Sequence, residues 1–210
     1  MLNIEAARKW YQQKDPVHGM SHVLRVYSLV ERLAEAEGAD IEIVRAAALL
    51  HDAEGPGVGD TRLEHQHASA HFAAEILSNE GWVDEKIAEV QHCIRAHRFR
   101  DQSEQPRSIE AKVLFDADKL DAIGAVGAVR AIAYAVLARQ DLFATPSEQF
   151  VLTGKKEPGE PHTPYHEHLF KLQKIKGRLF TESGREVAGE RHAFLDSFFV
   201  QLAAELNNES

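Results

Sequence analysis

Apolar residues recur every three or four positions through most of the chain, a spacing that places them on one face of an α-helix. No segment shows the clear apolar–polar alternation of a half-buried β-strand. The pattern therefore predicts an all-α protein. The expected helices cover residues 1–14, 22–37, 40–51, 67–79, 84–97, 110–118, a continuation to 139 after a break, 166–181 and 186–207.

Residues with capping chemistry mark several of these boundaries. Ser21 is expected to cap the second helix, Gly38 to end it, and Asp40 to cap the third. Three segments lack helical periodicity and are expected to be loops: glycine-rich 55–66, charged 99–108 and proline-rich 144–164. The last is long enough to serve as a lid.

Length and composition allow a single hydrophobic core. The chain has 210 residues, of which 44% are hydrophobic, and neither number requires a second domain. We therefore expect residues 1–210 to form one helical bundle. Cys93 is the only cysteine, so no internal disulfide can form, which fits a reducing compartment.

Charge and targeting signals narrow the classes of function. The net charge of −9 argues against general nucleic-acid binding, which needs a basic face, but it leaves room for a small anionic substrate beside a bound cation. There is no run of 18 apolar residues and no basic-then-apolar N-terminus, so we expect a cytoplasmic protein without membrane association.

The strongest candidate for chemistry is His51-Asp52, at the end of an apolar helix. Adjacent side chains on a helix point about 100° apart, so both reach one point only if it lies close to the backbone. A divalent metal ion is such a point, because imidazole and carboxylate are both good ligands. The alternative is a pair of polar residues that simply cap the helix.

Two further segments also present histidine or aspartate on an apolar helix. His22 follows Gly-Met-Ser, and Asp118 lies within a run of aspartate, lysine and leucine. Together with His51 and Asp52 they would form a mixed nitrogen and oxygen site between facing helices. Their separation along the chain is too large for spacing alone to show that they converge.

This ordered pattern resembles the HD-domain metal-dependent phosphohydrolases, especially small stand-alone bacterial members. The likeness is specific over residues 17–138 and looser over 165–206. The matching segments are His18-Gly-Met-Ser-His22-Val-Leu-Arg-Val, Ala48-Leu-Leu-His-Asp52 and Asp116-Ala-Asp-Lys-Leu-Asp-Ala-Ile-Gly124.

The resemblance implies a single HD-type domain with a C-terminal helical extension, residues 165–207, packed on it. It also implies that one divalent ion binds to His22, His51, Asp52 and Asp118. Manganese or magnesium is favoured, and cobalt, iron, nickel or zinc would also suit the ligand set.

Three nearby residues are candidates for catalysis. Glu54 is a candidate general base acting through water, the alternative being an exposed acidic residue at a loop mouth. His97 matches the family's phosphate-side histidine. Lys119 adjoins Asp118 and is the best candidate for a cation that neutralises phosphate.

Three others are candidates for contact with substrate. Arg98 offers a cation, and His67 either lines the pocket or lies on a helix surface. Asp121 is a candidate to orient a ligand histidine, whereas Asp116 is a candidate helix cap.

The expected function is hydrolysis of phosphate or pyrophosphate bonds in small phosphorylated substrates, with nucleotides as the favoured class. One alternative is a cyclic-nucleotide phosphodiesterase, which the lack of an evident second set of metal ligands disfavours. A second is a non-catalytic regulatory protein that binds nucleotide or metal. The expected partner is a small anionic substrate, and a homodimer is left open.

Overall fold

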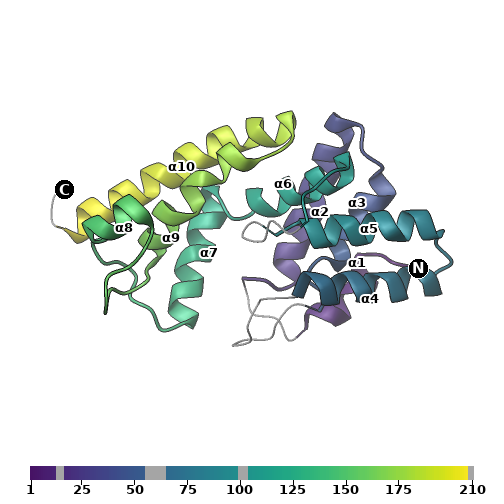
Figure 1. The fold of residues 1–210 in the computed structure, drawn as a ribbon, viewed down its shortest axis with the longest axis horizontal. Coiled ribbons are helices and arrows are strands. Elements are labelled where there is room, and N and C mark those ends of the chain that lie inside the picture. Colours follow the sequence, from purple (N-terminus) through teal and green to yellow (C-terminus); the bar gives the residue numbers. More distant parts are fainter. Residues whose placement is uncertain (13–16, 55–64, 99–103, 208–210) are drawn as a thin grey trace. The chain divides into compact units, whose positions relative to one another are not determined.

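The structure is a computed structural model, and it describes residues 1–12, 17–54, 65–98 and 104–207. Within these ranges no strand occurs, so the prediction of an all-α fold is confirmed (Figure 1). The helices are α1 (Ile4–Ala7), the 3₁₀-helix η1 (Arg8–Tyr11), α2 (Met20–Glu37), α3 (Ile41–Leu50), α4 (His65–Asn79), α5 (Asp84–Ala96), α6 (Ile109–Leu120), α7 (Gly124–Leu137), α8 (Glu148–Thr153), α9 (Pro164–Phe170), the 3₁₀-helices η2 (Leu172–Lys174) and η3 (Lys176–Arg178), and α10 (Glu182–Leu206).

Two of the three predicted caps are confirmed. Gly38 ends α2 in the left-handed region at φ 71°, and the Asp40 side chain accepts hydrogen bonds from the first backbone amides of α3. The prediction for Ser21 is wrong. The carbonyl of Gly19 already accepts from the amides of His22 and Val23, so α2 begins at Met20 and Ser21 lies in its first turn.

Several helix boundaries differ from the predicted ones. Helix α4 begins at His65, two residues early, and α8 lies inside the segment expected to be a loop. The helix expected at 166–181 is instead the short α9 followed by η2 and η3. Most of the two other predicted loops, residues 55–64 and 99–103, lies outside the described residues.

The chain divides into two compact units. The first comprises Met1–Lys119 with Leu179–Gly184, and the second comprises Leu120–Arg178 with the chain from Arg185 onward. In the first unit α2 packs against α3, α3 against α5, and α4 against α5 (Figure 1). Helix α3 is buried along most of its length, so its C-terminal end delivers side chains to the interior.

In the second unit an aromatic stack joins α9 to α10. The rings of His168 and Phe199 lie nearly parallel with their centroids 4.4 Å apart, and both side chains are buried. Helix α7 starts with a close backbone approach, because a Cβ on Gly127 would lie 2.3 Å from the carbonyl oxygen of Ala122. Glycine is therefore required there.

Among the described residues no single helix is long and apolar enough to cross a membrane. Only α6 and α7, taken together as a bent pair, reach the required length and composition.

Burial of His168 is expected to make the protein less stable in mild acid. Burial lowers the pKa of His168 to about 4, against about 6.5 in an unfolded chain. Between these pH values the unfolded state binds the extra proton, so stability falls as the pH drops from about 6.5 toward 4. His168→Gln should flatten this loss, measured as the unfolding midpoint against pH in the presence of chelator. Equal pH dependence in variant and wild type would contradict the expectation.

Candidate metal centre

His51 and Asp52 follow directly on the last turn of α3, where small side chains allow neighbouring helices to approach closely. Residues Ala46–Leu50 are all buried, and His51 itself has no exposed surface. The ring orientation is set locally, because His51 Nδ1 lies 2.8 Å from the carbonyl oxygen of Ala48. That nitrogen therefore donates, and Nε2 carries the lone pair that can bind a cation.

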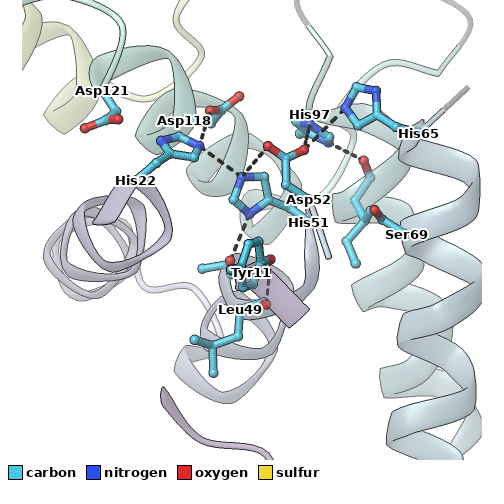
Figure 2. Close-up of polar contacts among 12 residues, drawn as sticks. Tyr11, His22, Leu49, His51, Asp52, His65, Ser69, His97, Asp118 and Asp121 are labelled. Atoms are coloured by element: carbon cyan, nitrogen blue, oxygen red, sulfur yellow. Dashed lines mark hydrogen bonds and ion pairs between the residues drawn. The ribbon is translucent and has the colours of Figure 1, made fainter. Parts of the chain in front are cut away.

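Figure 2 shows His22, from α2, facing His51 across a narrow gap. Their Nε2 atoms are 3.3 Å apart, and Asp52 Oδ2 lies 3.7 Å from His51 Nε2. These three residues offer ligand atoms that all lie within 4.8 Å of one another. Two buried imidazoles and a carboxylate aimed at one point fit a divalent ion.

Asp118, from α6, joins this group through His22. Its Oδ1 is 3.4 Å from His22 Nε2, and its Oδ2 pairs with the ammonium of Lys119. Burial by itself raises the pKa of Asp118, but Lys119 and the neighbouring histidines outweigh it and hold the pKa well below its usual range. Asp118 is therefore a carboxylate at neutral pH. The structure thus groups His22, His51 and Asp52, and it places Asp118 beside His22.

Asp52 also faces a second pair of histidines. Its Oδ1 lies 3.3 Å from His65 Nε2 and 3.8 Å from His97 Nε2, and the three residues form another group of ligand atoms within 4.8 Å (Figure 2). Burial lowers the pKa of His97 to about 3, so this ring is neutral at physiological pH. Asp52 therefore belongs to two groups of candidate metal ligands, one with His22 and His51 and one with His65 and His97.

His65 is the residue that sequence reasoning missed. It falls in the predicted loop 55–66, and only its position just before a predicted helix could have indicated its role. Because α4 begins at His65, the first turn of this helix points the ring at Asp52. The predicted neighbour His67 is exposed on the same helix.

The other predicted residues lie in different surroundings. The guanidinium of Arg98 donates to the buried side-chain oxygen of Gln66 at 3.2 Å, which holds it at the end of α5. Glu54 is exposed, and its backbone amide donates to Ser69 Oγ. Asp121 belongs to the second unit, where its carboxylate pairs with Arg130 at 2.5 Å.

The side chain of Asp116 is buried in the first unit and has a structural role. Its carboxylate is fully buried and accepts hydrogen bonds from the backbone amides of Phe180 and Thr181 and from the Thr181 hydroxyl, at 2.6 to 3.1 Å. It therefore holds the chain just before α10, a role close to the predicted one of a helix cap.

Known proteins share the sequence pattern and the fold that hold this cluster of histidines and aspartates. Residues 19–123 match the HD domain family. An uncharacterised protein of Bacillus subtilis, YpgQ, is 33% identical over 209 residues, covering 96% of this chain and 93% of its own length. The crystal structure of YpgQ in complex with ADP superposes with a TM-score of 0.73 at 32% identity, covering 97% of both chains.

A further solved structure extends the comparison. It is an HD-superfamily hydrolase from Bacillus thuringiensis, with a TM-score of 0.72 at 25% identity, covering 97% of this chain and 94% of the other. An HD domain implies a divalent-metal site, for which the clustered histidines and aspartates of the first unit provide ligands. The chain belongs to the HD-domain family, whose members include metal-dependent hydrolases.

Proposed function

We propose that the protein is a metal-dependent phosphohydrolase that cleaves phosphate or pyrophosphate bonds in nucleotides. The observation that carries the proposal is the pair of buried imidazole nitrogens 3.3 Å apart, flanked by the carboxylates of Asp52 and Asp118. The ADP bound to YpgQ supports a nucleotide as the substrate class.

In this proposal His22, His51, Asp52 and Asp118 hold one divalent ion, with manganese or magnesium favoured. When bound, such an ion polarises a phosphoryl group and lowers the pKa of a coordinated water. The ligand set fits because His51 presents an Nε2 lone pair and both carboxylates are ionised.

The residues next to the metal ligands supply a positive charge and a hydrogen-bond acceptor. Lys119, held by Asp118 and lying over the ring of Phe115, neutralises charge on the phosphoryl oxygens. His97 is neutral and fixed, because its Nδ1 lies 2.5 Å from the Ile94 carbonyl oxygen. Its Nε2 can therefore accept a hydrogen bond from a water, although a pKa of about 3 makes it a weak base at neutral pH.

Arg98 and Glu54 complete the proposed site. The Gln66 side chain fixes the guanidinium of Arg98, which suits it to bind a phosphate of the substrate. Glu54 remains a candidate base that acts through water. On α4 it is His65 that faces Asp52, whereas His67 is exposed, so His65 takes the place of His67 in the proposed pocket.

The second group of candidate metal ligands favours one alternative function, that of a cyclic-nucleotide phosphodiesterase. Asp52, His65 and His97 offer the additional ligands whose lack argued against a cyclic-nucleotide phosphodiesterase. A phosphodiesterase of this kind would bind two ions per chain, with Asp52 shared between them. Metal analysis of purified protein distinguishes one ion from two.

Product analysis across a nucleotide panel tests the proposal. Chelator-treated protein, reloaded with manganese or magnesium, is incubated with nucleoside mono-, di- and triphosphates and with cyclic nucleotides. Phosphate and pyrophosphate are measured separately. We expect metal-dependent release from non-cyclic nucleotides. Cleavage of cyclic nucleotides alone would establish the alternative, and metal-loaded protein that cleaves nothing would refute both.

A further inference from the structure

A buried tyrosine from the N-terminal segment lies next to the His51–Asp52 pair. Tyr11, in η1, is 3% exposed, and its hydroxyl donates a hydrogen bond to the backbone carbonyl of Leu49 at 2.9 Å (Figure 2). Leu49 belongs to the last turn of α3, where backbone carbonyls run out of partners within the helix. Tyr11 thus satisfies a buried carbonyl two residues before the first candidate ligand of the pair.

The same hydroxyl is influenced by the second candidate ligand of the pair. Burial and then the negative charge of Asp52 raise the pKa of Tyr11, so the hydroxyl keeps its proton and remains a donor. The Ala48 carbonyl, one residue before Leu49, accepts a hydrogen bond from the ring of His51. Tyr11 and His51 therefore bind neighbouring carbonyls in the same turn of α3.

Packing leaves the tyrosine ring little freedom. It belongs to a cluster of buried residues from η1, α1, α2 and the end of α3, and Trp10, Tyr27 and Phe72 are among the partly buried residues packed around it. The part of the chain that matches the HD domain family starts at residue 19, so Tyr11 lies outside the shared domain.

We propose that Tyr11 is a positioning residue of the metal centre, which fixes the backbone at the end of α3 so that His51 and Asp52 converge. This inference rests on the metal site of the proposed function. Without the hydroxyl, the buried Leu49 carbonyl would lose its partner, and the end of α3 would shift so that this carbonyl could regain one. Loss of such an outer partner typically weakens metal binding about 10- to 100-fold.

Tyr11→Phe tests this, since it removes the oxygen and keeps the ring. Tyr27→Phe is the matched control, because Tyr27 packs against the same cluster, whereas the pKa of its hydroxyl is shifted by burial and by the charges of Arg45 and Glu31, and not by that of Asp52. Mn²⁺ dissociation constants are measured by calorimetry on the full-length protein, together with the visible spectrum of the Co²⁺ form. We expect Tyr11→Phe to bind Mn²⁺ about 10- to 100-fold more weakly and to alter the Co²⁺ spectrum. Tyr27→Phe should match wild type in both.

The outcomes separate this inference from the proposed function. A folded Tyr11→Phe protein with wild-type affinity and spectrum would overturn the inference, even if its chelator-treated form unfolded more easily. Wild-type protein that binds no metal would overturn the proposed site itself. If the variant does not fold, proton exchange of the Tyr11 hydroxyl in wild type decides: a slowly exchanging hydroxyl proton supports the bond to the Leu49 carbonyl, and exchange too fast to observe refutes it.

Discussion

Replacing His51 with alanine is expected to abolish metal binding and with it hydrolysis, with at least about a 100-fold loss of activity, since even outer partners of a metal site are worth 10- to 100-fold. The His51 Nε2 atom lies at the centre of the cluster, 3.3 Å from His22 and 3.7 Å from Asp52. Removing the imidazole takes away the ligand nitrogen that lies between His22 and Asp52. Metal content and product release of the purified variant measure the effect.

His71→Ala is the matched control for this variant. His71 lies on α4 with its side chain 80% exposed and paired with Glu75. The control should retain the metal content and activity of wild type. Equal metal content in His51→Ala and wild type would show that the pair only caps α3, the alternative that the sequence left open.

Replacing Asp116 with alanine is expected to destabilise the fold by about 3–5 kcal/mol, because each buried donor left without a partner costs roughly 1–3 kcal/mol. Three donors from Phe180 and Thr181 depend on this one carboxylate. Gly184 packs so closely that a Cβ there would lie 2.6 Å from the carboxylate oxygen, so the site has little room to rearrange. Urea unfolding in the presence of chelator measures the change.

Asp116→Asn separates the loss of hydrogen bonds from the loss of volume. The amide keeps one acceptor oxygen and nearly the same shape, so we expect a smaller destabilisation than with alanine. Metal affinity of the folded variants should stay close to wild type, because Asp116 faces the chain before α10 and not the ligands. A loss of less than about 0.5 kcal/mol for Asp116→Ala would fall within the range of an ordinary surface change and contradict this role.

The three aspartates of α6 and the turn after it show what could be predicted for the site. All carry the same functional group within six residues, so only the family resemblance singled out Asp118. The structure places Asp118 beside His22, Asp116 beneath Thr181 and Asp121 with Arg130. Each partner comes from a distant part of the chain or another helix, and no local pattern encodes it.

Helix boundaries show the same contrast between features that a local sequence pattern encodes and features that it does not. Gly38 and Asp40 were predicted correctly, because a left-handed glycine and an accepting carboxylate act on backbone groups a few residues away. Ser21 was predicted incorrectly, since Gly19 had already begun the helix. An error of two residues at the start of α4 was enough to hide His65 from the candidate site.

The sequence by itself determined the all-α class, most of the helices and the order of the four candidate ligands. These depend on the 3.6-residue period, on capping and on motifs read along the chain. Only the tertiary structure decided that His22, His51 and Asp52 meet, and that His65, His97 and Tyr11 surround them. The reason is physical: their approach depends on how the buried faces of separate helices pack, and residues far apart along a chain carry no local signal of that packing.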